Sequence, residues 1–353
     1  MPLHKNQISQ TILGTIKKGT VIPAHPLALD AQRKLDQRRQ RALTRYYLDA
    51  GVGGIAVGVH TTQFEIREAG LYHRVLELAA ETTDDWSDRP IARIAGLVGP
   101  TQQALAEART AVTLGYHAGL LSLSAFQKAS EDEMIEHCQQ IANEIPLFGF
   151  YLQASVGGRL LSSSFWRRFA EIENVIAIKI APFNRYHTLD VIHGIVAAGA
   201  ENRITLYTGN DDHIVLDLIL PFSCMRNGEE VQVRFKGGLL GHWSVWTAKV
   251  VSLFEKIQTF SANDQVDSKL LSLDSMITDC NSAFFDVANQ FQGCIAGCHE
   301  VLRRQGLLEG IWCLDPKETL SKGQAEEIDR VYQAYPELND DKFVRSNLER
   351  WLA

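Results

Sequence analysis

The stretch Val175-Ile176-Ala177-Ile178-Lys179-Ile180-Ala181 carries six apolar side chains around a single lysine. Its apolar residues do not alternate with polar ones, which is typical of a strand buried on both faces of a parallel sheet. Seven similar short runs occur elsewhere in the chain. With this one, the expected strands are residues 21–24, 54–59, 91–98, 119–123, 147–152, 175–180, 204–208 and 231–240. The pattern predicts an α/β protein.

Segments with helical periodicity separate these runs. They are residues 35–50, 69–81, 102–114, 131–143, 163–172, 188–198, 211–220 and 247–259. Strand–helix units of this kind form either a closed barrel or a doubly wound sheet, and the latter often carries a glycine-rich loop after its first strand. Here the first run continues as Pro23-Ala24-His25-Pro26. We therefore predict a (β/α)8 TIM barrel over residues 1–260, with a C-terminal helical extension at 261–353 packed on it.

The composition and net charge indicate which class of molecule the protein binds. The 353 residues are 45% hydrophobic and 22% charged, which is typical of a globular protein, and the formal net charge is −7. A negative chain is a poor match for nucleic acid or an anionic membrane, so we expect a small-molecule substrate. Without an apolar run of about 18 residues or the apolar core of a signal peptide, the expected location is cytoplasmic.

The six cysteines are scattered along the chain, which predicts reduced thiols and no disulfide framework. Cys294 and Cys298 could share a helix face, but a zinc site needs two further ligands at suitable spacing, and none stands out. We interpret both as core residues and expect neither a metal nor another cofactor.

Lys179 is the first candidate for chemistry. An ammonium group buried in an apolar strand has a lowered pKa and becomes a usable amine nucleophile, although a lysine at a strand end can also extend to solvent or pair with a carboxylate.

Tyr151 ends the preceding run, so we expect its phenol next to Lys179, either as a proton carrier or as an apolar cap of the barrel. Thr61 and Thr62 follow the second run, where paired hydroxyls could bind a carboxylate or cap a helix.

Together these residues resemble the dihydrodipicolinate synthase and N-acetylneuraminate lyase family of class I aldolases and lyases, over residues 17–335. Residues 54–65, GIAVGVHTTQFE, are similar to the family's strand and Gly-Thr-Thr-Gly-Glu loop. Residues 176–179 resemble its Schiff-base lysine strand, and Tyr151 precedes Lys179 at the spacing that the family shows. Residues 208–212, TGNDD, resemble the turn after its seventh strand.

The resemblance implies a role for each matched position. Lys179 would form an imine with a 2-oxo acid such as pyruvate, Tyr151 would carry the proton, and Thr61 with Thr62 would hold the substrate carboxylate. It also implies a barrel mouth at the carboxyl ends of the strands. The residues expected to line that mouth are His60, Phe126, Gly209 and Leu239, with His25 and His242 weighed as further polar contacts or as structural histidines.

Three departures from the family concern the second substrate. Val156 stands where the synthase has an arginine, Phe126 stands where it has a second tyrosine, and Gln63-Phe64 interrupts the threonine loop. Arg159 could replace the missing arginine, although a surface arginine at a helix start is the more ordinary interpretation.

We therefore expect a carbon–carbon lyase of the class I aldolase type rather than a true dihydrodipicolinate synthase. It would act on a 2-oxo acid and an aldehyde and form a homodimer or homotetramer. The alternatives are a hydratase-aldolase, dehydratase or decarboxylase that uses the same imine, or a catalytically degenerate barrel that binds a metabolite.

Overall fold

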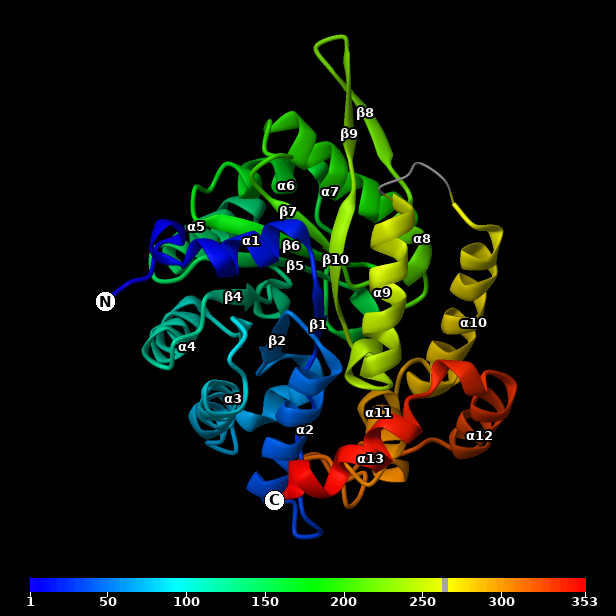
Figure 1. Ribbon diagram of the computed structural model, residues 1–353. Helices are drawn as coiled ribbons and strands as arrows, with labels where there is room; N and C mark the ends of the chain where they lie inside the picture. The colour runs from blue at the N-terminus through cyan, green and yellow to red at the C-terminus, as the bar shows by residue number, and fades with distance from the viewer. Residues whose placement is uncertain (262–265) are drawn as a thin grey trace. The chain divides into compact units, whose positions relative to one another are not determined.

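The computed structural model describes residues 1–261 and 266–353 (Figure 1). Eight strands alternate with helices as the predicted (β/α)8 TIM barrel requires, and further helices follow at the C-terminus, which confirms the predicted fold class. The barrel strands are β1 (Val21–Pro23), β2 (Gly54–Val57), β3 (Ala92–Leu97), β4 (Ala118–Leu121), β5 (Leu147–Leu152), β6 (Val175–Ala181), β7 (Thr205–Thr208) and β10 (Phe235–Leu240).

The helices that follow these strands begin and end within a few residues of the predicted positions. They are α2 (Gln37–Ala50), α3 (Tyr72–Trp86), α4 (Thr101–Thr113), α5 (Glu131–Ala142), α6 (Ser163–Ala170), α7 (Arg185–Ala197), α8 (Ile214–Ile219) and α9 (Thr247–Ser261). Ser130 and Ser162 cap α5 and α6 by accepting the N–H groups of Glu133 and Phe165. None of the described helices is long and apolar enough to cross a membrane.

The contacts divide the chain into two compact units. The first unit holds residues 1–20 and 92–239, including α1 (Gln10–Lys18) and the strands from β3 onward. Its strands lie in the order β10-β7-β6-β5-β4-β3 and pair in parallel. Tyr207 of β7 packs its ring 5.3 Å from that of Phe148 on β5 and donates its hydroxyl proton to the carbonyl of Ile16. This bond ties α1 to the strands.

The second unit holds residues 21–91 and 240–353. It contains β1, β2, α2, α3, α9 and the C-terminal helices α10 (Ser268–Phe284), α11 (Cys294–Arg304), α12 (Gln324–Ala334) and α13 (Asp341–Leu352). Tyr46 of α2 donates to Asp340 at 2.7 Å, and Trp351 of α13 donates to Asp49 at 2.5 Å. The extension therefore packs on α2. Its expected start at residue 261 coincides with the end of α9, just before residues 262–265, which lie outside the described part of the chain.

The prediction of one strand over residues 231–240 is wrong. The structure breaks this run after Val233, so that β9 (Glu229–Val233) pairs antiparallel with β8 (Phe222–Arg226), and only β10 joins the barrel. The cause is the turn at Asn227-Gly228, where both residues have positive φ (54° and 85°), as a two-residue hairpin demands. In Figure 1 this hairpin extends beyond α6 and α7.

Candidate active site

Lys179 lies near the carboxyl end of β6, a strand whose seven residues are all buried. Its side chain is only 9% exposed. The β5–β6 register places Phe150 directly opposite Lys179, and the lysine Nζ lies 4.6 Å from the centroid of the Phe150 ring. Opposed residues on neighbouring strands share a face of the sheet, so the amine and the phenyl ring lie on the same side of the strands.

Burial lowers the pKa of Lys179 to about 8, and the carboxylate of Asp211 partly opposes this by raising it. A lysine with a pKa near 8 has about a tenth of its amine neutral at pH 7, against well under a thousandth for an exposed lysine. Lys179 is therefore chemically able to act as a nucleophile.

Gly209, expected in the pocket, lies against the stem of this lysine. A Cβ at this position would come within 2.6 Å of Lys179 Cε and 2.7 Å of Ala181 Cβ. Both distances are far below an ordinary carbon–carbon contact of about 3.5–4.0 Å. Only glycine therefore lets the lysine stem pass over the end of β7, and its N–H still bonds the carbonyl of Ile180 at 2.7 Å.

A buried polar network holds the loop after β7. Asp217 of α8 is fully buried, accepts hydrogen bonds from Thr208 at 2.5 Å and Asn210 at 2.9 Å, and pairs with Arg185. The network fixes the backbone that leads to Asp211. The predicted site did not include this network, although a single acidic residue in the apolar segment Ile214–Ile219 is a usable signal for it.

Tyr151 is not beside the amine, and the prediction that placed its phenol there is wrong. Its hydroxyl donates to the carbonyl of Leu161 at 3.4 Å and accepts the N–H of the same residue at 3.2 Å. Its ring centroid lies 5.3 Å from that of Trp166 on α6 and 6.2 Å from that of His187 on α7. The phenol therefore points into the helical layer.

The reason is an irregularity in the pairing of β5 with β6. These strands pair first at Leu147 and Val175, and a regular register from there would bring Tyr151 opposite Lys179. The register instead shifts directly after this first pair, because β6 contains one extra residue at that point. All later pairs move by one position, so that Phe150 lies opposite Lys179 and the tyrosine faces the other side of the sheet. The spacing in the sequence thus fits a regular pairing that the two strands do not form.

Thr61 and Thr62 occupy the 3-10 turn after β2 (His60–Thr62), within the second unit. The Thr62 hydroxyl donates to the carbonyl of His25 at 2.6 Å and accepts the N–H groups of Gly58 and Val59, which uses all its bonding capacity. Thr61 donates its proton to the carbonyl of Ala24 at 2.8 Å. Both hydroxyl protons thus bind backbone carbonyls, and the carboxylate-binding role of these two residues stays a prediction.

The other expected pocket residues have ordinary packing partners. His60 lies 5.8 Å from the ring of Phe64, and Leu239 is fully buried in β10. The ring of Phe126 lies 4.3 Å from that of His137 at a tilt of 38°, and the Phe126 carbonyl accepts a hydrogen bond from Arg159. Arg159 also binds the carbonyl of Ala129, so it ties two loops of the first unit together.

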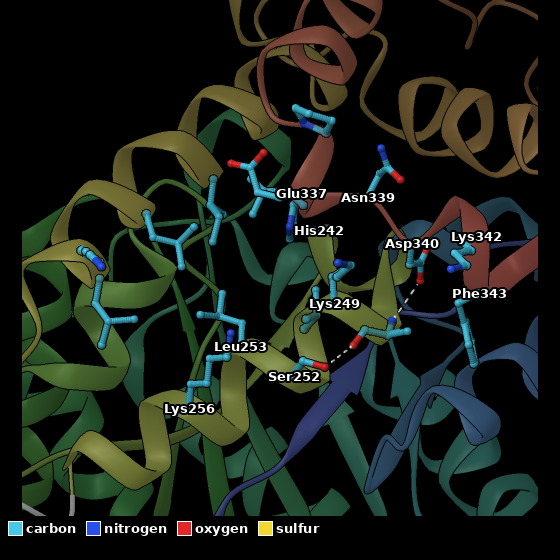
Figure 2. A pocket seen from close by; sticks show the side chains of 18 of the residues that line it. His242, Lys249, Ser252, Leu253, Lys256, Glu337, Asn339, Asp340, Lys342 and Phe343 are labelled. Atoms are coloured by element: carbon cyan, nitrogen blue, oxygen red, sulfur yellow. Dashed lines mark hydrogen bonds between the residues drawn. The ribbon is translucent and has the colours of Figure 1, made fainter.

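The second unit contains a cavity of about 1200 Å³ between α9, α10 and the segment that leads into α13 (Figure 2). Lys249 and Lys256 project from α9, opposite Glu337 and Lys342. His242 lies in its wall, stacked on Phe284 at 6.0 Å, and burial lowers its pKa to about 4. Its described lining includes none of the candidate catalytic residues.

Among the described residues, no three or more His, Cys, Asp or Glu side chains are grouped so as to hold a metal ion. At the candidate site, the amine of Lys179 lies over the ring of Phe150 and within the influence of the Asp211 carboxylate.

The model of the dihydrodipicolinate synthetase family matches residues 17–221. The chain belongs to this family. Among its relatives is 4-hydroxy-tetrahydrodipicolinate synthase of Persephonella marina, which is 24% identical over 179 residues and is matched over 49% of this chain and 60% of its own length. N-acetylneuraminate lyase 2 of Escherichia coli O6:H1 is 21% identical over 323 residues, covering 91% of this chain and 95% of that protein.

Solved structures show the same fold. The E. coli K12 prophage protein YagE, determined in complex with pyruvate, superposes with a TM-score of 0.73 at 18% identity, covering 91% of this chain and 98% of its own. The resemblance inferred from the lysine strand and the threonine loop is thus confirmed at the level of the family and its fold.

Proposed function

We propose that this family member is a carbon–carbon lyase of the class I aldolase type, acting on a 2-oxo acid such as pyruvate through an imine on Lys179. The observation that carries the proposal is the buried lysine amine on β6, with its pKa lowered to about 8 beside Phe150 and the glycine that admits its stem. An amine of this kind has little structural use in an apolar strand, because burying it costs free energy.

The chemistry follows from the amine. The Lys179 nitrogen attacks the carbonyl carbon of the 2-oxo acid, the carbonyl oxygen takes up protons, and water leaves to form a protonated imine. The imine withdraws the electron pair of the adjacent carbon–carbon or carbon–hydrogen bond and becomes an enamine, which adds to an aldehyde or takes up a proton. Dehydration and decarboxylation share this enamine and are alternative outcomes of the same site.

The proton transfers need a carrier other than the expected tyrosine, because Phe150 occupies the position beside the amine and cannot transfer a proton. We assign this role to Asp211, whose charge acts on Lys179 and which lies shortly after the glycine that contacts the lysine stem. Its carboxylate would take up a proton from the attacking amine and return it to the departing hydroxide.

Phe150 also favours a second candidate, a barrel that binds a metabolite without turnover. The two candidates differ in what they do after binding. An enzyme of the proposed kind forms an imine and exchanges the methyl protons of pyruvate with solvent, whereas a binding barrel leaves the ligand unchanged.

Borohydride reduction tests the proposal directly. We expect pyruvate and borohydride together to add a reduced pyruvyl group to Lys179, seen by peptide mass spectrometry, and to add none to Lys179→Met. Lys249→Met is the matched control, because Lys249 is exposed in the cavity wall, and it should be labelled like the unaltered protein. If a panel of 2-oxo acids gives no adduct on Lys179, the imine mechanism is refuted.

A further inference from the structure

The cavity in the second unit carries four lysines. Lys249 and Lys256 belong to α9, Lys269 to α10 and Lys342 to α13, and every residue of the described lining belongs to this unit. All four lysines are exposed, and none of them forms an ion pair with a carboxylate in the part of the chain that the structure describes. In a chain with a net charge of −7, these cations are a local concentration of positive charge.

The carboxylates in the lining are fewer than the lysines and are partly engaged elsewhere. Asp340 is buried and accepts a hydrogen bond from the hydroxyl of Tyr46 at 2.7 Å. Asp267 caps α10 and accepts the backbone N–H of Lys269 at 2.9 Å. Of the three acidic residues that line the cavity, Glu337 is then left to face four ammonium groups. The cavity therefore favours an anionic ligand.

Three of these lysines occupy positions that do not stabilise their helices. Lys249, Lys269 and Lys342 each lie in the first turn of a helix, where the positive end of the helix dipole disfavours a cation. Helix stability therefore does not explain these side chains, whereas the binding of an anion does.

The lysines of α9 are well separated along the cavity. Lys249 and Lys256 are seven residues apart, so they share one face of the helix at about 10 Å along its axis. The backbone N–H of Ala248 bonds Asp340 at 3.0 Å, which brings the start of α9 to the start of α13. Lys249 and Lys342 therefore lie toward the same end of the cavity.

The other end holds Lys256 and Lys269, and the part between the two ends is apolar. The helices α9 and α10 both line the cavity and run in opposite directions, so the first turn of α10 lies toward the last turns of α9 (Figure 1). Leu253 lies between the two lysines of α9 on the same face (Figure 2), and Leu273 and Ile277 follow Lys269 at helical spacing. The lining thus has positive charge at both ends and apolar side chains between them.

We propose that this cavity binds an elongated ligand with an apolar middle part and an anionic group, carboxylate or phosphate, at each end. Its volume of about 1200 Å³ exceeds the roughly 300–1000 Å³ of ordinary small-molecule pockets, so the ligand is larger than pyruvate. No residue of the first unit takes part. The site therefore stands independently of the imine proposed for Lys179.

Isothermal titration calorimetry with decanedioate tests the proposal, because its extended chain separates two carboxylates by a distance similar to that between Lys249 and Lys256. Decanoate, which lacks one charge, should bind about three- to tenfold more weakly. Succinate, which lacks the apolar middle, should bind at least about a hundredfold more weakly. The bisphosphonate of the same chain length shows by its relative affinity whether the ends prefer carboxylate or phosphate chemistry.

Charge reversal tests the lysines. In Lys249→Glu/Lys342→Glu both new carboxylates lie in the first turn of a helix, where the dipole favours them, so the protein should stay folded. We expect decanedioate to bind at least about tenfold more weakly to this variant. Lys322→Glu is the matched control, because Lys322 is an exposed lysine of the same unit outside the cavity lining, and its Kd should change less than about twofold.

A second pair of variants tests the apolar middle. Leu273→Ala removes part of a half-buried side chain from the lining and should weaken decanedioate by about three- to tenfold. Leu271→Ala is its control, because Leu271 lies on the same helix, is 50% exposed and is not part of the lining. Its Kd should equal that of the unaltered protein.

Three results would overturn the proposal. The first is the absence of both binding heat and a rise in Tm with decanedioate and the bisphosphonate. The second is an equal loss of affinity in Lys322→Glu and in the double variant. The third is a change of oligomeric state in the double variant, seen by light scattering, without any binding of decanedioate, because a second copy of the chain would then occupy the cavity. Lys179→Met should bind decanedioate like the unaltered protein, so a failure of the imine leaves this site untouched.

Discussion

Replacing Gly209 by alanine tests whether the lysine stem depends on the space that this glycine leaves. The new methyl would lie 2.6 Å from Lys179 Cε, 3.0 Å from Lys179 Cγ and 2.7 Å from Ala181 Cβ. Ordinary contacts of about 3.5–4.0 Å require a displacement of roughly 1 Å. Because the Ala181 methyl cannot rotate away, most of that displacement falls on the lysine.

Overpacking of this size costs about 1–3 kcal/mol of unfolding free energy, and a displacement of about 1 Å at a reacting atom can slow a reaction by about a hundredfold. We therefore expect Gly209→Ala to lower the urea midpoint and to slow borohydride trapping of pyruvate by roughly ten- to a hundredfold.

Gly14→Ala provides the matched control. Gly14 lies inside α1 with no atom within 4 Å of its added methyl, so alanine should raise the unfolding free energy by about 0.5–1 kcal/mol and leave trapping unchanged. A Gly209→Ala protein as stable and as quickly trapped as the unaltered one would show that the lysine stem does not run over Gly209.

Three further predictions concern the amine, the phenol and the threonine. Since burial lowers the pKa of Lys179 from 10.5 to about 8, the unfolded chain binds more protons between these values, and stability should rise with pH across that window. Lys179→Met should then be more stable than the unaltered protein at pH 7, by up to about 3 kcal/mol, and lose that advantage near pH 10 in urea titrations. Tyr151→Phe should lose about 1 kcal/mol of unfolding free energy with the Leu161 bonds but be trapped by pyruvate at nearly the unaltered rate, and a drop of about a hundredfold would return the phenol to the mechanism. Thr62→Val should lower the unfolding free energy by about 2–3 kcal/mol, because it breaks three buried hydrogen bonds, and calorimetry showing an unchanged Tm would contradict that structural role.

The wrong prediction of a single strand over residues 231–240 has a local cause. The run 231–240 looks like one strand because its apolar residues are nearly continuous, but the Asn227-Gly228 turn pairs its first half with residues 222–226. Residues 229–233 are mostly exposed, as befits an antiparallel strand with a solvated face. A turn signal therefore carried more information than hydrophobicity at this point.

The contacts of the C-terminal extension are a second feature that the sequence does not predict. The extension packs on α2 through ring contacts such as that of Tyr46 with Trp351 and through polar contacts such as those of Tyr46 with Asp340 and of Trp351 with Asp49. The partners in each pair lie near opposite ends of the chain, so no local pattern predicts them. The bond from Leu314 to Gln63 is of the same kind, which is why the sequence presents Gln63 only as an interruption of the threonine loop.

The sequence alone determined the alternation of strands and helices and the place of Lys179 in a buried strand. Both depend on the hydrophobic pattern over a few neighbouring residues, because segments that fold away from water must carry apolar side chains at the buried positions. The tertiary structure decided which aromatic ring lies beside the Lys179 amine and which acceptors the hydroxyls of Thr61 and Thr62 bind. One extra residue in β6 places Phe150 instead of Tyr151 opposite Lys179. A shift by one residue has this effect because successive side chains of a strand point to opposite faces. Backbone carbonyls took the protons of Thr61 and Thr62, because buried hydrogen-bonding groups must be satisfied by whatever the fold brings near them.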